Sequence, residues 1–186
     1  NKLNHKDTIY RCKVYYNYKV EISDSYGCVS NSNIIGDTCY NVQSPNILVL
    51  DSVSVNSSGQ AVIGWEPSSS SDVNSYIIYS VSPGNVLTSI DTIYGYNNTS
   101  FIDVGSAVGS NSEGYCVAAI DSCKNYSIPS ISHNSIFLNA PTYDLCQRSA
   151  SLTWTPYSNL PNGILNYDIY SSINGSPFSF VGTTSG

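Results

Sequence analysis

One aromatic pattern occurs twice in this chain, and its two copies lie 89 positions apart. Each copy has a tryptophan two residues before a proline, followed by a Tyr-x-x-Tyr sequence. Residues 62–67 and 76–79 form the first copy, and residues 152–156 and 167–170 form the second. Because both copies are rich in β-branched and aromatic residues, a repeat of this length is typical of tandem β-sandwich domains. The sequence therefore predicts an array of small sandwiches.

Short strand-like segments fill the stretch around the first copy. They are separated by Gly, Pro, Ser and Asn residues at the spacing that a sandwich requires. The predicted strands are residues 47–55, 61–65, 76–81, 87–94, 99–104 and 115–120. No long segment repeats its apolar residues with the period of an amphipathic helix. We therefore predict an all-β fold.

A second internal match sets the domain boundaries. Residues 18–25 parallel residues 115–122, 97 positions later, in spacing, residue type and alternation. The chain then divides into the C-terminal part of one repeat (1–44), a complete repeat (45–133) and the N-terminal part of the next (134–186). Since a lone half-sandwich exposes its core face, we expect the two partial repeats to belong to a longer molecule.

These residues resemble the fibronectin type III domain, which has a tryptophan in its second strand, tyrosines in its third and a Tyr-x-Val-x-Ala sequence in its sixth. The resemblance covers nearly all of residues 45–133 and part of both flanks. It implies tandem fibronectin type III-like (immunoglobulin-like) sandwiches, with the Tyr115 hydroxyl bonded back to the loop before its strand. The core anchors that it implies are Trp65, Tyr76, Tyr115, Trp154 and Tyr167.

Finer details are similar to a narrower group, the repeats of very large gliding-motility-associated surface proteins of the Bacteroidetes group. Residues 51–55, 121–127 and 132–138 carry this resemblance, although Lys124 stands where the group usually has glycine. Proteins of the group are exported by the type IX secretion system. The resemblance implies an extracellular or cell-surface location and a filament-like adhesin, and it leaves the ligand open.

Three short motifs fit that origin. An aspartate followed by serine or threonine and an aliphatic residue resembles the signal for O-linked glycan addition in this bacterial group. The candidate glycosylation sites are Thr8, Ser52 and Thr92. Sugars at these positions would add bulk and shield strand edges. A tripeptide this short also recurs by chance in a chain rich in serine and threonine.

The charge balance excludes one large class of partners. The chain has 7 Lys and Arg against 13 Asp and Glu, which gives a formal net charge of -6. Nucleic-acid binding requires a basic surface, so we expect no nucleic-acid partner. No apolar run approaches the roughly 20 residues of a membrane helix, so we expect no membrane insertion. Any export signal would lie outside this sequence.

Six cysteines are present, and none forms a Cys-x-x-Cys pair. Together with only two histidines, this spacing argues against a zinc site. An even number of cysteines in an acidic β-repeat protein favours disulfides in an oxidising compartment, with buried free thiols as the alternative. We predict a Cys12–Cys28 disulfide, because these residues flank one strand of the first repeat, and leave the other four cysteines open.

The residues needed for catalysis do not group in the sequence. His5 lies near the start, and His133 lies at a predicted domain junction, where we expect it to bond a linker carbonyl. Asp24 and Asp121 recur at matching turns, where their side chains are expected to cap the turn through local hydrogen bonds. No nucleophile elbow or phosphate-binding loop is present. We predict a protein that is not an enzyme and has no cofactor or resident metal.

The function that these observations favour is structural. We expect a spacer segment of a large exported adhesin, whose partners are other repeats of the same chain, secretion or outer-membrane surface machinery, and glycans. Two alternatives stay open: an accessory module of a secreted carbohydrate-active enzyme, and a secretion cargo segment bound to the export machinery. Loop tyrosines could stack on glycans, but packing at domain junctions or strand edges is favoured for Tyr94, Tyr96, Tyr126 and Tyr157.

Overall fold

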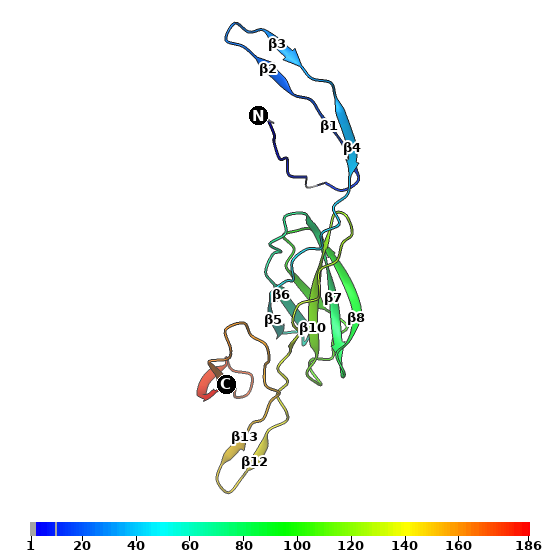
Figure 1. Ribbon diagram of the computed structural model, residues 1–186. Helices are drawn as coiled ribbons and strands as arrows, with labels where there is room; N and C mark the ends of the chain where they lie inside the picture. Colours follow the sequence, from blue (N-terminus) through cyan, green and yellow to red (C-terminus); the bar gives the residue numbers. More distant parts are fainter. Residues whose placement is uncertain (1–2, 10) are drawn as a thin grey trace.

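The computed structural model describes residues 3–9 and 11–186, and all regular secondary structure in these residues is β-strand. The all-β prediction is therefore confirmed. The molecule is elongated: a long hairpin projects from one end of a central sandwich, and the C-terminal segments lie at the other end (Figure 1).

The central sandwich has two sheets. One sheet has three strands in the order β5-β6-β9, and the other has four in the order β11-β10-β7-β8. Their bounds are β5 (Leu50–Val55), β6 (Ala61–Trp65), β7 (Val73–Ser82), β8 (Val86–Tyr94), β9 (Ser100–Asp103), β10 (Gly114–Asp121) and β11 (His133–Asn134). The first, second and fifth strands thus face the third, fourth, sixth and seventh, which is the strand order of a fibronectin type III sandwich.

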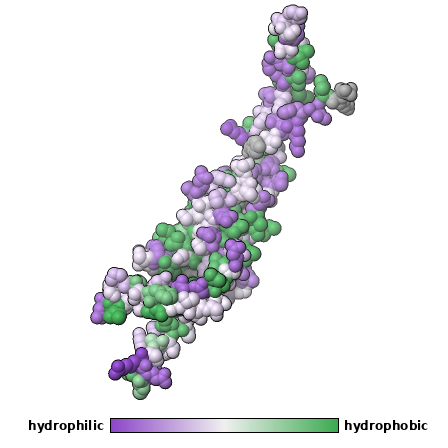
Figure 2. Space-filling view, turned by 90° about the vertical axis from the view of Figure 1, so that its left-hand side faces the viewer, coloured by the Kyte–Doolittle hydropathy of each residue, from purple (hydrophilic) through white to green (hydrophobic). Residues whose placement is uncertain are grey.

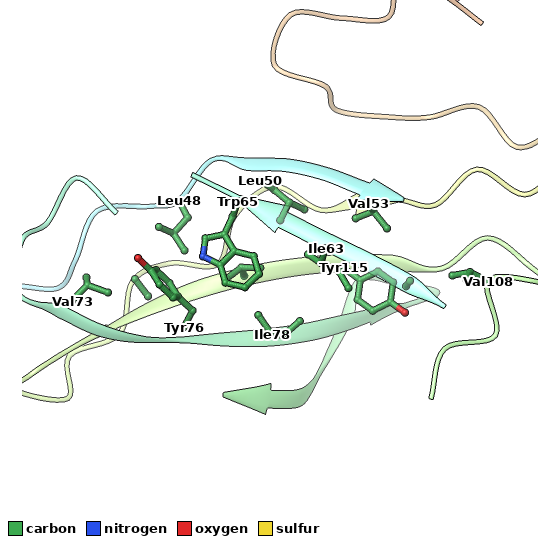
Figure 3. Packing of buried hydrophobic residues seen from close by; sticks show 13 residues of the cluster. Leu48, Leu50, Val53, Ile63, Trp65, Val73, Tyr76, Ile78, Val108 and Tyr115 are labelled. Carbon is green, nitrogen blue, oxygen red and sulfur yellow. The ribbon is translucent and has the colours of Figure 1, made fainter. Parts of the chain in front are cut away.

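Period-2 alternation decides which side chains enter the core. In β6, Ala61, Ile63 and Trp65 are buried while the residues between them are partly exposed. Antiparallel pairing of β7 with β10 places Ile78 opposite Val117. Side chains from the two sheets then meet in one apolar layer, which Figure 3 shows from close by.

Aromatic rings form the centre of this layer. Trp65 packs edge-on against Tyr76, with ring centroids 5.4 Å apart and planes inclined by 63°. Tyr115 lies further along the same core (Figure 3). Edge-to-face packing of this kind adds to the free energy gained by burying the rings. The structure thus places three of the expected core anchors, Trp65, Tyr76 and Tyr115, inside the sandwich.

The last edge of the four-stranded sheet uses serine side chains in place of a regular strand. Each of three buried serines donates its backbone N–H to a carbonyl of the β10 segment and accepts, on Oγ, the N–H of the same residue. The pairs are Ser127 with Ala119, Ser130 with Val117 and Ser135 with Glu113. The serines therefore satisfy backbone donors along an edge that contains Pro129, a residue with no N–H.

The flanking segments form isolated hairpins. At the N-terminal end, β1 (Val14–Tyr18) pairs with β4 (Ile35–Cys39), and β2 (Glu21–Ser23) pairs with β3 (Val29–Asn31). At the C-terminal end, β12 (Thr142–Asp144) pairs with β13 (Ser149–Ser151), and β14 (Asn166–Ser171) pairs with β15 (Ser179–Ser185).

Both flanking segments repeat the bonding of the central sandwich. The Tyr18 hydroxyl donates to Asp7, as the Tyr115 hydroxyl does to Asp103. The rings of Trp154 and Tyr167 lie 5.4 Å apart and are inclined by 61°, which matches the buried tryptophan–tyrosine pair of the centre. Unlike that pair, both are only partly buried. The two sequence repeats therefore correspond to repeated local structures.

Tyr115 joins the core to two carboxylates. Its hydroxyl lies 3.0 Å from Asp103 Oδ2 and 2.9 Å from Glu113 Oε2, and its ring is buried. Glu113 belongs to the loop before β10, as the fibronectin resemblance implies, whereas Asp103 ends β9. Burial raises the pKa of Tyr115, and the bonds to Glu113 and Asp103 raise it further. The hydroxyl therefore stays protonated and acts as a hydrogen-bond donor.

We expect the Tyr115→Phe substitution to lower the free energy of unfolding by about 1–3 kcal/mol, because it leaves two carboxylates without their buried donor. Tyr79→Phe is the matched control, since no hydrogen bond of the Tyr79 hydroxyl is found in the described part of the chain. Urea unfolding of both variants measures the difference. Equal stability of the two variants would contradict the assigned role.

Candidate functional site

No cluster of metal-binding side chains is found among the described residues. Within residues 3–9 and 11–186, no three His, Cys, Asp or Glu side chains gather in a group that could hold a metal ion. His5 is exposed in the N-terminal segment, and His133 is buried in β11. Polar side chains that bond one repeat to the next lie at the two junctions between repeats, and these junctions are the candidate functional site.

The N-terminal junction is covalent. A disulfide joins Cys12, just before β1, to Cys123, in the turn after β10. The two residues are 111 positions apart in the sequence, and their Cα atoms are 5.0 Å apart. The bond therefore ties the N-terminal hairpin to the turn after β10 of the complete repeat, a turn that is distant from Cys12 in the sequence. The predicted Cys12–Cys28 disulfide is wrong, because Cys28 is an exposed free thiol.

A buried aspartate holds Cys123 in place. Asp121 Oδ1 accepts the backbone N–H of Cys123 at 2.8 Å and that of Asn125 at 2.7 Å. This carboxylate is fully buried, so it fixes the turn from inside. It therefore caps the turn through local hydrogen bonds, as predicted from the sequence. Asp24 makes the same pair of bonds, to the N–H groups of Tyr26 and Cys28. Those bonds lower the pKa of Asp24.

The same turn also binds the linker between the two repeats. Asn125 Nδ2 donates to the Asn41 carbonyl at 3.0 Å, and Asn41 Nδ2 donates to Asp72 Oδ2 at 2.8 Å. A polar cavity of about 530 Å³ lies beside this linker, lined by the linker itself, by residues 8–9 and by the loop before β7. The disulfide is therefore supported by a continuous set of amide and carboxylate contacts.

The C-terminal junction is centred on one tyrosine hydroxyl. Tyr157 Oη accepts the backbone N–H of Val53 at 2.7 Å and lies 3.1 Å from His133 Nδ1. The rings of His133 and Tyr157 meet edge-to-face, with centroids 5.6 Å apart. Asn159 Nδ2 also donates to the carbonyl of Ser132 at 2.7 Å. A loop of the last segment thus docks on the outer edges of the central sandwich.

The repeated geometry of the Trp–Tyr motif positions that loop. The Tyr167 hydroxyl accepts the backbone N–H of Tyr157 at 2.9 Å, just as the Tyr76 hydroxyl accepts that of Ser68 at 3.3 Å. Tyr157 therefore occupies the position of Ser68 in the preceding repeat, with a longer side chain that reaches across the junction. The expectation of a junction role holds for this residue, whereas Tyr94 and Tyr126 are exposed.

His133 is held as a neutral ring. Burial lowers its pKa from the ordinary value of 6.5, while a bond to the backbone of Asn159 and the Asp51 carboxylate act in the opposite direction. Since Tyr157 Oη already accepts from Val53, its own proton is free to point at His133 Nδ1, which accepts it only when the ring is neutral. The backbone partner of His133 is thus Asn159, in a loop of the last segment rather than in the linker as predicted, and a side-chain bond to Tyr157 accompanies it.

The remaining cysteines are reduced and differ in exposure. Cys28 and Cys146 are exposed, Cys39 is partly exposed and Cys116 is buried in β10. Burial raises the pKa of Cys116 to about 11. A thiol with so high a pKa carries almost no thiolate at neutral pH, so it is chemically inert in the folded domain.

The candidate glycosylation sites differ in their surroundings. Thr8 is exposed in the segment before β1, whereas Ser52 in β5 and Thr92 in β8 are partly buried. Glycosylation at these positions stays a prediction. In the described residues, no helix has the length and apolar character needed to span a membrane.

Comparison with known proteins adds little to this picture. No family model matches the chain, and no curated protein sequence matches it. Among solved structures, "The crystal structure of a Fn3-like protein from Clostridium thermocellum" is similar over 49% of this chain and 88% of its own, with 24% identity and a TM-score of 0.39. The assignment of a sandwich therefore depends on the strand order and register described above.

We expect the C-terminal junction to weaken as the pH falls. Well above pH 6.5 the ring of His133 is neutral whether docked or undocked, and the junction has its full stability. Below that value the undocked state binds the proton more readily, because burial lowers the docked pKa, so docking is progressively lost. Limited proteolysis of residues 134–186 at pH 7.5 and pH 5 measures the effect. His133→Phe should remove the pH dependence, and equal cleavage of the parent chain at both pH values would contradict it.

We expect alkylation to separate the cysteines by environment. Without reductant, three thiols should react in the native protein, Cys116 should react only on unfolding, and Cys12 and Cys123 should not react. Intact mass should therefore show four added groups after denaturation and six after reduction. The Cys116→Ala variant should lose only the group that is added on unfolding. Six added groups without reductant would rule out the interdomain disulfide.

Proposed function

We propose that this chain is a non-enzymatic spacer: tandem β-sandwich repeats whose junctions set the distance and angle between the parts of a larger surface protein. The observation that carries the proposal is the Cys12–Cys123 disulfide, which joins two adjacent repeats rather than closing a loop within one. A bond of that kind limits movement between repeats and adds nothing to a catalytic site.

The disulfide also defines how force would travel along the chain. Tension applied at the two termini passes from Cys12 directly to Cys123, so the covalent path bypasses the residues between them. These residues include all the strands from β1 to β10. The central sandwich is thereby protected from being pulled apart strand by strand. Such protection suits a spacer that carries load between a cell surface and a distal binding region.

An exported location accompanies this proposal. Disulfides persist in oxidising compartments, and a staple between repeats supports an extracellular or cell-surface setting. Within that setting, the motifs of residues 51–55 and 121–127 favour a gliding-motility-type adhesin exported by type IX secretion. Its partners would be neighbouring repeats, the surface machinery that exports it, and glycans.

Single-molecule pulling from both termini tests the spacer proposal. Reduction of the disulfide should add a hidden length of roughly 370–400 Å, because 111 residues then extend at about 3.3–3.6 Å each. The Cys123→Ser variant should show this longer extension without reductant. Cys28→Ser is the matched control, since Cys28 is free, and it should behave as the parent chain. Equal extension of the parent chain and Cys123→Ser would contradict the proposal.

A further inference from the structure

One of the free cysteines lies at the disulfide junction. Cys39 is the last residue of β4, and its carbonyl accepts the backbone N–H of Lys13 at 3.0 Å. Since that nitrogen is bonded to the carbonyl carbon of Cys12, the hydrogen bond holds the backbones of Cys12 and Cys39 side by side. The register of β1 with β4, which places Val14 opposite Cys39, leads to the same arrangement.

The third cysteine of the junction is held near the same strand end. Asn125, from the turn that carries Cys123, donates its side-chain amide to the carbonyl of Asn41, two residues after Cys39. The Asp121 carboxylate accepts the backbone N–H groups of both Cys123 and Asn125, so the turn is fixed as a unit. The three cysteines therefore lie around the end of β4. Cys39 also lines the polar cavity beside the linker.

The other free thiols are placed elsewhere in the molecule. Cys28 lies at the tip of the N-terminal hairpin, in the turn between β2 and β3 (Figure 1). Cys146 lies in the turn between β12 and β13, and Cys116 is buried in β10. Among the described residues, Cys39 is thus the free thiol that the structure places beside the disulfide.

Tension acts differently on this thiol and on the bond beside it. In the spacer proposed above, load applied at the two termini passes through the Cys12–Cys123 bond, so the strands from β1 to β10 do not bear it. The hairpin that carries Cys39 therefore stays folded and keeps its thiol in position while the disulfide itself is stretched. Since the bond between two sulfurs must lengthen when a third sulfur attacks, tension speeds the attack.

We propose that Cys39 is an exchange thiol that releases the disulfide between the repeats under tension, an inference that rests on the proposed spacer function. The Cys39 thiolate attacks Cys12 Sγ and forms a Cys12–Cys39 disulfide. The Cys12–Cys123 bond breaks, and Cys123 leaves as a thiolate that takes a proton from water. One disulfide and one thiolate are present before and after the step, so neither an oxidant nor a reductant is consumed.

The exchange would lengthen the spacer while keeping its chain intact. Once Cys12 is bonded to Cys39, load passes along the linker into the central sandwich, which is no longer bypassed. The buried apolar cluster belongs to the central sandwich alone, and Figure 2 shows hydrophilic residues at the surface where the hairpin meets it. The contacts left at the junction are the amide and carboxylate bonds of the linker. The sandwich would then unfold and absorb the load, while the hairpin stays closed by its new disulfide.

Pulling of the oxidised 186-residue chain at constant force without reductant tests the proposal. The parent chain should lengthen in one step of roughly 280–300 Å, because residues 39–123 then extend at about 3.3–3.6 Å each. Full reduction should instead release roughly 370–400 Å, so the two events can be told apart. The step should occur several-fold faster at pH 8.5 than at pH 7, since the thiolate is the attacking species.

Two variants that each lose one free thiol of the hairpin separate the roles. Cys39→Ser should lose the step and should still show the longer extension once reductant is added, which demonstrates that its disulfide with Cys123 is formed. Cys28→Ser is the matched control, because it removes a free thiol at the other end of the same hairpin. It should keep the step at the rate of the parent chain.

Three results would each overturn the proposal. The first is a step of equal length and rate in Cys39→Ser. The second is a step of only roughly 90–100 Å, because attack on Cys123 Sγ would extend residues 12–39 alone and leave the sandwich bypassed. The third is a parent chain without any step whose Cys123→Ser variant still gives the longer extension. That last result would refute the exchange and leave the spacer function standing.

Discussion

The pairing of β10 with β7 is the interaction on which the rest of the structure depends. Buried along nearly its whole length, β10 supplies Tyr115, Val117 and Ala119 to the core and Cys116 to the opposite face of its sheet. Its end turns at Asp121, and that carboxylate holds Cys123 where the disulfide forms. Because side chains alternate along a strand, a slip of one residue against β7 would exchange the two faces. It would also displace the turn, so the core and the covalent junction are set by one register.

The serine edge explains how a sandwich can also serve as a link in an array. A regular last strand would have to run alongside β10 over the whole length of β10. The side chains of Ser127 and Ser130 accept N–H groups of β10 instead, and that of Ser135 accepts the N–H of Glu113 just before β10. The backbone can therefore follow an irregular path without leaving those donors unsatisfied. Ser32 does the same for Val20 in the N-terminal hairpin. The last element of each repeat is therefore both an edge strand and the beginning of the linker to the next repeat.

Alternation and internal repeats in the sequence predicted the strands of the sandwich, but they did not predict the contacts at its junctions. The strands of the central repeat lie close to where alternation placed them, with two larger differences: β5 begins at Leu50 rather than residue 47, and β7 begins at Val73 rather than residue 76. The start of β7 is earlier because β10 is long enough to pair that far. Repeats in the sequence also revealed the Trp–Tyr pairs and the two aspartate turns. The Cys12–Cys123 bond depends on how two repeats are arranged in space, and no local spacing carries that information. Nor could sequence alone show that Tyr157 reaches across to Val53 and His133, since the three residues are distant in the chain.

The two junctions differ in chemistry, and the difference gives the molecule a fixed side and a reversible side. The N-terminal junction is covalent, whereas the C-terminal junction depends on one hydroxyl shared between a backbone N–H and a neutral imidazole. Tyr167 links that reversible junction to the interior of the last repeat, because its hydroxyl accepts the N–H of Tyr157 while its ring packs edge-on against Trp154. Undocking of Tyr157 would therefore loosen the position of Tyr167 and its contact with Trp154. The charge of His133 and the packing of the Trp154–Tyr167 pair are thus coupled through Tyr157.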